Sequence, residues 1–347
     1  MTSDCQRSIR PRLFPSYFGV FIAVACAAAL GLKNFASAET WAERLGFPAG
    51  KKVLILHAQE IGFCHSANAA AIALHESHPE QSSSVIVPGP WFFDYVDWNL
   101  NRPDADVGLE LTLNSELQNH RWQPVSPHDL VASLTDSEGF YWPTTTQTMV
   151  NGSADEVEQE LHNQIQRALR SGLKPTHLTT HLGTLFMRLD FTEVYFRVAR
   201  QYWIPAVVIE LTPEHIERFR SMGFPAPDEL IKLLHDYPLP KVDDMQFVQP
   251  ADSYEEVRDQ FLGLIRSMSP GLTQLAFHPA IETDELKRMT PDWQQRVWAM
   301  QLFEDPEVRA LMAEENVVFT NWREIMQRFH GQIPAPAIEM ADEPPSP

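Results

Sequence analysis

The sequence contains very little cysteine. Only three cysteines occur in 347 residues, and two of them, Cys5 and Cys26, fall within the first 38 residues. Cys64 is therefore the single cysteine of the remainder, which excludes an internal disulfide and a CxxC metal site. Because unpaired cysteine is among the residue types most often found buried, we interpret Cys64 as a small core residue rather than a nucleophile.

Basic residues are also scarce, with 27 Lys and Arg against 46 Asp and Glu and a formal net charge of −19. A chain this acidic repels phosphate backbones, so nucleic acid is not an expected partner. A neutral or cationic small molecule or oligosaccharide suits the charge better, and we also allow for a homodimer. No internal repeat is visible, which argues against a solenoid or a propeller.

The first 38 residues have the order of a secretory signal. Three arginines precede the apolar stretch "YFGVFIAVACAAALGL", and small residues at Ala36 and Ala38 follow it. We predict cleavage after Ala38 and export to the periplasm or the extracellular space, without stable membrane association afterwards. The alternatives are an uncleaved anchor, for which the apolar stretch is short, and a lipoprotein attached through Cys26.

Residues 39–331 are predicted to form one domain in which strands alternate with helices, and residues 332–347 an acidic, proline-rich, disordered tail. Short apolar or alternating runs predict strands at 53–57, 84–87, 107–113, 176–181, 206–211, 272–278 and 316–320. Two helices are marked by a Ser and a Glu at capping-box spacing, Ser153 with Glu156 and Ser253 with Glu256. This pattern favours an α/β fold with mostly parallel strands and outer helices, either open or closed into a barrel. Residues 212–248 are interpreted as a surface excursion or as a lid.

Polar residues lie in or at the ends of four predicted strands. They are Glu60, Glu110, His181 and His278. Active sites of parallel α/β folds lie at the carboxyl ends of the strands, so these side chains can meet at one mouth. Two carboxylates and a histidine suit a hard or borderline divalent metal. The alternative is that each polar group is satisfied separately by loop backbone.

Several ordered blocks between Lys51 and Phe329 together resemble one known family. Among them are "LILHAQEIGFCHSANAA", "DVGLELTL", "GFYWPT", "PTHLTTHLGTLF" and "LAFHPA". In this order and spacing they are similar to the YdjC-like, or ChbG/HpnK-like, carbohydrate deacetylases. The resemblance implies a distorted TIM-like (β/α) barrel and metal-dependent hydrolysis of an N-acetyl group on a sugar.

The resemblance also implies roles for particular positions. In the family the first strand typically ends in Asp-Asp, a general base followed by a metal ligand. Histidines in a "GxHLTL" block and in a "THxDxH" block complete the metal site, and a histidine before proline is the candidate acid. This chain has Gln59 at the base position, Glu60 at the metal-binding aspartate, Glu110 at the first histidine and Thr179 at the aspartate of the third block.

The remaining family positions are retained. His181 matches the metal-binding histidine, His278 the candidate acid, and His177 the first histidine of its block. The expected site therefore has Gln59 and His278 as catalytic residues and Glu60, Glu110 and His181 as ligands of Mg²⁺ or Zn²⁺. The expected substrate contacts are His177, Trp91 and Trp142, although tryptophans in such blocks are also common in cores.

Two functions follow from these residues. The first is an exported metal-dependent hydrolase that deacetylates amino sugars or their oligomers. The second is a catalytically inactive homologue that binds carbohydrate or metal, because an amide at Gln59 cannot accept a proton from water. An arginine or backbone N–H groups bound to Glu60 or Glu110 would favour the second function. A phosphoester substrate has little support, since no basic cluster lies near the motifs.

Overall fold

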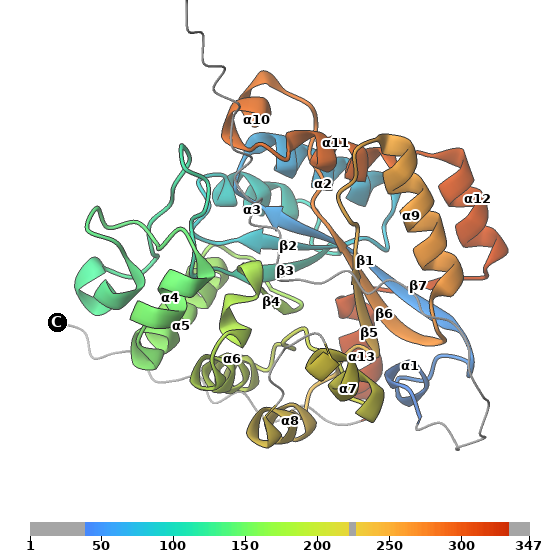
Figure 1. Ribbon diagram of the computed structural model, residues 1–347, viewed down its shortest axis with the longest axis horizontal. Helices are drawn as coiled ribbons and strands as arrows, with labels where there is room; N and C mark the ends of the chain where they lie inside the picture. The colour runs from blue at the N-terminus through green and yellow to red at the C-terminus, as the bar shows by residue number, and fades with distance from the viewer. Residues whose placement is uncertain (1–38, 222–226, 333–347) are drawn as a thin grey trace, which may run out of the picture.

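A computed structural model describes residues 39–221 and 227–332 of the chain (Figure 1). The predicted signal and the predicted tail, apart from Gln332, lie outside the described residues. Within the described ranges, no helix is both long enough and apolar enough to cross a membrane.

The described strands form one parallel sheet, in agreement with the predicted α/β class. They are β1 (Lys52–Ile61), β2 (Ser82–Ile86), β3 (Asp106–Leu111), β4 (Leu178–Thr180), β5 (Asp244–Phe247), β6 (Gly271–Phe277) and β7 (Val318–Phe319). Their order is β4-β3-β2-β1-β6-β5, and β7 pairs with the first half of β1. Residues 53–56 of β1 are completely or almost completely buried, as expected for a parallel sheet covered on both faces.

Residues 205–210 join the two edges of this sheet. The amide of Val207 donates to the carbonyl of Leu178, the first residue of β4, and the amide of Glu210 donates to the carbonyl of Val242 just before β5. The prediction of a regular strand at 206–211 was wrong, because this segment makes only two isolated bridges, Leu178 with Ala206 and Ile209 with Val242. These bridges nevertheless complete a ring, so the fold is a distorted TIM-like barrel.

Helices surround the sheet (Figure 1). They are α1 (Trp41–Arg44), α2 (His65–Ser77), α3 (Phe92–Leu100), α4 (Thr145–Asn151), α5 (Ala154–Arg170), α6 (Leu189–Tyr202), α7 (Pro213–Ser221), α8 (Asp228–His235), α9 (Tyr254–Ser267), α10 (Asp284–Met289), α11 (Trp293–Gln301), α12 (Pro306–Glu314) and α13 (Trp322–Gln332). Short 3₁₀ turns are η1 (His128–Leu130), η2 (Ala132–Leu134) and η3 (His181–Phe186). The segment 212–248 thus contains α7, α8 and the unpredicted strand β5, so the surface-loop interpretation was incomplete.

The two predicted capping boxes differ in outcome. Ser253 accepts a hydrogen bond from the amide of Glu256 at the start of α9, as predicted, but the Glu256 carboxylate accepts the amide of Asp252 rather than that of Ser253. Ser153 makes no side-chain cap at α5; instead its amide donates to the hydroxyl of Ser133 in η2, and the Glu156 carboxylate accepts the amide of Ser133. A tertiary contact has therefore replaced the expected local one.

The long connection between β3 and α4 is fastened to the barrel by one buried carboxylate. Glu160 of α5 is fully buried and accepts the amides of Val125 and Ser126, each at 2.9 Å, and the hydroxyl of Tyr141 at 2.5 Å. Buried carboxylates require this kind of compensation. The blocks "RWQPVSP" and "GFYWPT" thus serve to hold this connection beside the carboxyl ends of the strands.

Candidate metal and hydrolase site

The end of β1 has an unusual backbone that places Glu60. The pairing of β1 with β2 shifts register between Ala58 and Ile61, and Glu60 adopts a left-handed φ of 58°. A glutamate in this region is uncommon and indicates that surrounding contacts fix the conformation. One such contact is the Glu60 amide, which donates to Oε2 of Glu110 at 2.7 Å.

The buried carboxylate inside β3 is compensated by neighbouring elements. Glu110 is 2% exposed. Its Oε2 accepts the Glu60 amide and the hydroxyl of Ser84 at 3.1 Å, and its Oε1 lies 2.8 Å from Nδ1 of His181. The desolvation cost of burying this carboxylate is therefore offset by three polar contacts.

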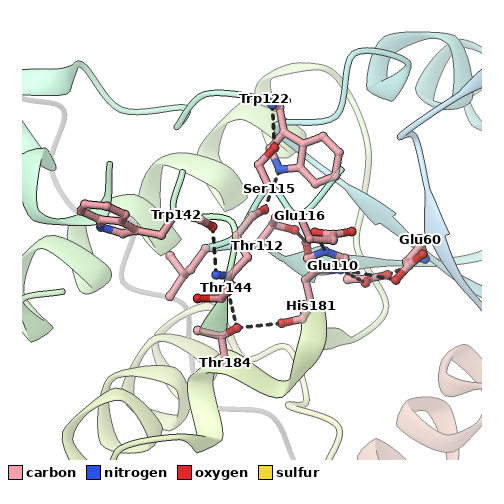
Figure 2. A network of polar contacts seen from close by, with 12 residues as sticks. Glu60, Glu110, Thr112, Ser115, Glu116, Trp122, Trp142, Thr144, His181 and Thr184 are labelled. Carbon is pink, nitrogen blue, oxygen red and sulfur yellow. Dashed lines mark hydrogen bonds and ion pairs between the residues drawn. The ribbon is translucent and has the colours of Figure 1, made fainter. Parts of the chain in front are cut away.

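His181 is the first residue of η3, directly after β4, and it is fully buried. Its Nδ1 faces Glu110, and its Nε2 lies 3.0 Å from Oε2 of Glu116. Burial alone would lower the pKa of His181, but Glu116 and Glu110 outweigh burial and raise this pKa well above its usual value. Figure 2 shows the carboxylates of Glu60 and Glu110 directed at the imidazole of His181.

These three side chains have the donor chemistry of a divalent-cation site. One ligand atom from each of Glu60, Glu110 and His181 lies within 4.8 Å of the other two. Each donor has an outer partner on one atom: Arg296 on Glu60 Oε2, Ser84 on Glu110 Oε2, and Glu116 on His181 Nε2. Such partners orient metal ligands, and here Nδ1 is the ring atom of His181 directed at the other two residues, where it faces Glu110 Oε1 at 2.8 Å. The residues present therefore fit a divalent metal.

Both contacts that would favour binding without catalysis, an arginine on Glu60 and a backbone N–H on Glu110, are present. Each of them involves only one oxygen of the carboxylate. Arg296 Nη2 lies 2.5 Å from Glu60 Oε2, and the Glu60 amide binds Glu110 Oε2. Oε1 of Glu60 lies 3.8 Å from His181 Nδ1 and 3.7 Å from His278 Nε2. Burial would raise the pKa of Glu60, but Arg296 above all, with the two histidines, holds this pKa well below its usual value. Glu60 therefore remains a carboxylate with one oxygen directed toward the cluster.

The other two family positions are occupied by neutral groups. Gln59 is half-buried beside Glu60, and its amide has no useful basicity. Thr179 is buried on β4, with its hydroxyl 3.5 Å from the carbonyl of Leu109. His278 follows β6 and has a side chain that is 21% exposed, so it is accessible at the rim of the cluster.

His177, a predicted substrate contact, lies inside the barrel and is fully buried. The indole of Trp322 donates to Gln274 Oε1 at 2.8 Å, so the Gln274 amide nitrogen faces Nδ1 of His57. His57 must then donate from Nε2 to His177 Nε2 at 2.9 Å, and His177 from Nδ1 to Thr176 at 3.0 Å. This chain of hydrogen bonds requires both imidazoles to be neutral.

The two predicted tryptophans do not join the acidic cluster. Trp91 precedes α3, and its ring lies edge-on to His65 with centroids 5.1 Å apart. Trp142 donates from its indole to the carbonyl of Ser133 at 2.9 Å, and Figure 2 shows it pointing away from Glu60 and Glu110. Substrate contact by these residues and by His177 remains a prediction.

Two residues of the site were missed in the sequence. Glu116 lies six positions after Glu110 in "ELTLNSE", so the polar character of this segment was the available signal. Arg296 lies 236 residues from Glu60 and belongs to no motif. Only the packing of α11 against the end of β1 brings it into the site.

Comparison with known proteins agrees with the fold and the motifs. A family described as YdjC-like protein matches residues 53–314. The chain is 34% identical over 287 residues to a carbohydrate deacetylase of Thermus thermophilus, covering 82% of this chain and 97% of the relative. A carbohydrate deacetylase of Thermoanaerobacter pseudethanolicus is 21% identical and is covered to 98%, with 78% of this chain.

A solved structure gives the same result for the fold. The crystal structure of a putative cellobiose-phosphate cleavage protein from Enterococcus faecalis superposes with a TM-score of 0.65 at 21% identity, covering 79% of this chain and 99% of that one. Since the family match extends over most of the chain and one relative exceeds 30% identity over nearly its full length, this protein belongs to the YdjC-like family.

Proposed function

We propose that this protein is a metal-dependent hydrolase that removes N-acetyl groups from amino sugars or their oligomers. The observation that carries the proposal is the convergence of Glu60, Glu110 and His181 at the carboxyl end of the barrel. Family relatives matched over nearly their full length bear the name carbohydrate deacetylase, which supports the reaction class.

In this proposal Glu60, Glu110 and His181 hold Mg²⁺ or Zn²⁺. Two carboxylates suit Mg²⁺, whereas the imidazole also suits Zn²⁺. The chemistry that a divalent cation supplies when bound is polarisation of the acetyl carbonyl and a lower pKa for water. Arg296 pairs with both Glu60 and Asp292, so it offsets only part of the negative charge of the Glu60 carboxylate.

The reaction requires water to attack the acetyl carbon, the C–N bond to break, and the amine to leave with an added proton. His278, partly exposed and 3.7 Å from Glu60, is the proposed proton donor to the amine. Gln59 can orient the attacking water but cannot accept its proton. Another group must take this proton: Glu60, Glu110, a histidine of the site, or the more exposed Glu116, with 23% of its side chain accessible.

Binding without turnover is the second candidate. Gln59 at the position of the base supports it, and so does the pairing of Glu60 with Arg296, because both weaken proton abstraction from water. On this alternative the barrel would bind a cation or a carbohydrate through the same cluster and release no acetate.

Metal content and acetate release, measured on one purified sample, separate the two candidates. Divalent metals are quantified by mass spectrometry, and acetate release is assayed with N-acetylglucosamine oligomers in added Mg²⁺, Mn²⁺ or Zn²⁺. For the hydrolase, Glu60→Gln and His181→Ala should lower both bound metal and acetate release by at least about 10-fold. Glu158→Gln and His162→Ala are matched controls, since they form a Glu–His pair on α5 outside the cluster.

The outcomes are distinct. Bound metal without acetate release supports the binding scaffold. A well-folded protein with neither metal nor acetate release would rule out the hydrolase.

We also propose that the protein is exported after cleavage near Ala38. Amino-terminal sequencing of the protein secreted by an expression host would test this proposal, and an intact leader on a membrane-bound product would contradict it.

A further inference from the structure

Arg296 is a buried cation that contacts the site from a distant part of the chain. It lies on α11 and is 4% exposed. Nη2 binds Glu60 at 2.5 Å, Nε binds Asp292 at 3.1 Å, and the guanidinium lies 4.9 Å from the ring centroid of Phe63. Contacts on three sides fix this guanidinium, so it can act as a rigid support for the Glu60 carboxylate.

Two imidazoles lie close to the other oxygen of Glu60. Its Oε1 lies 3.8 Å from Nδ1 of His181 and 3.7 Å from Nε2 of His278. Both distances are just longer than a hydrogen bond. A glutamate side chain has three rotatable bonds, and a buried carboxylate without polar partners is costly. Without the bond to Arg296, a small rotation would bring Oε1 to His278 Nε2, or to His181 Nδ1 beside Glu110 Oε1.

We propose that Arg296 is a positioning residue that keeps Glu60 apart from His181 and His278. By binding Oε2, it leaves Oε1 directed into the space shared with Glu110 but not hydrogen-bonded to either histidine. Because the Glu60 carboxylate is held from behind, its Oε1 stays 3.8 Å from His181 Nδ1, whereas Glu110 Oε1 lies 2.8 Å from the same nitrogen. This inference rests on the proposed function only in assigning a divalent cation to that space.

The proposal has a consequence for metal affinity. A carboxylate that has closed onto an imidazole must break this contact before it can bind a cation, and outer partners of metal ligands typically contribute about 10- to 100-fold to metal affinity. The alternative predicts the opposite change in affinity. If Arg296 acted only as a positive charge that repels the cation, its removal would tighten metal binding. The direction of the change therefore decides between support and repulsion.

The test is Co²⁺ titration of the full-length protein, followed by its visible absorption spectrum and calorimetry. We expect Arg296→Met to raise the dissociation constant for Co²⁺ by at least about 10-fold. Arg296→Lys, which keeps the charge and one donor, should recover part of the affinity. Arg197→Met is the matched control, because Arg197 makes a bidentate pair with Glu158 on the surface and should leave Co²⁺ binding unchanged. Unchanged or tighter binding by Arg296→Met overturns the proposal.

A second measurement requires no metal. In a crystal structure of metal-free Arg296→Met, the Glu60 carboxylate should lie within hydrogen-bond distance of His181 or His278; an unmoved carboxylate overturns the proposal. If Arg296→Met does not fold, Arg296→Gln replaces it in both measurements. Failure of folded wild-type protein to bind Co²⁺ would overturn the metal-dependent function, and the crystal structure would still decide the role of Arg296.

Discussion

Acidification from pH 7 to pH 5 should destabilise this protein, because three buried histidines remain neutral in the folded state. Burial lowers the pKa of His177 to about 3 and that of His75 to about 4. Burial, with a further contribution from His177, lowers the pKa of His57 well below its usual value. In the unfolded chain each returns to a pKa near 6.5. Between pH 6.5 and pH 4 the unfolded chain binds more protons, so the free energy of unfolding falls as the pH falls.

The size of the effect follows from these pKa differences. At pH 5 each histidine is about 1.5 pH units below its unfolded pKa, which favours unfolding by about 2 kcal/mol per residue and about 6 kcal/mol for three. His181 acts in the opposite direction, because its raised pKa favours the folded state and this contribution is fully present below pH 6.5. From pH 7 to pH 5 it returns about 1 kcal/mol. A net loss of about 5 kcal/mol is a large share of a typical domain stability of about 5–15 kcal/mol.

Urea unfolding at pH 7, 6 and 5, followed by circular dichroism in EDTA, measures this loss. His57→Gln removes one titrating group but keeps a side chain that can hydrogen-bond to Gln274 and His177, so its loss between pH 7 and pH 5 should be smaller by about 2 kcal/mol. His235→Gln is the control, since the His235 side chain is 80% exposed. If His57→Gln loses as much stability as the wild type between these pH values, the neutral hydrogen-bonded histidine pair is not the cause.

Three further substitutions test other parts of the structure. Gln59→Asp restores a carboxylate beside Glu60 and should raise acetate release by about 100-fold, whereas Gln59→Asn should not; no increase would show that the base is not limiting. Gly108→Ala should lower the free energy of unfolding by about 1–3 kcal/mol, because its Cβ would lie 2.5–2.6 Å from the carbonyl oxygen and ring of His177. Glu160→Gln should cost about 2 kcal/mol in urea unfolding through weaker bonds to the loop amides, and a change below about 0.5 kcal/mol would contradict this role of Glu160.

Much of the fold could be predicted because hydrophobic patterning is local. The run at 53–56 and the alternation around Glu110 lie in strands β1 and β3. The failures are tertiary in origin: residues 206–211 close the barrel through isolated bridges, and β5 forms in a segment without a strong apolar pattern. At α5, Glu156 binds a loop amide instead of capping its own helix. No local rule in the sequence distinguishes these outcomes.

The candidate site was predictable to the extent that strand topology determines it. Glu60, Glu110 and His181 meet because parallel strands end at the same rim, and motif positions identify which residues lie there. The sequence does not reveal the left-handed conformation of Glu60 or the partner of its second oxygen. Arg296 comes from α11, and its contact with Glu60 depends on how a whole helix packs against the barrel.

The proposed function has two requirements, cation binding and proton abstraction from water. For the first, Glu60, Glu110 and His181 are all present, each with an outer partner. For the second, the family resemblance places the base at Gln59, where this chain has an amide. If Gln59→Asp gains acetate release without a change in metal affinity, the chain has kept the first requirement and weakened only the second. If the same variant also changes metal affinity, Gln59 belongs to the cation site, and the two requirements cannot be assigned to separate residues.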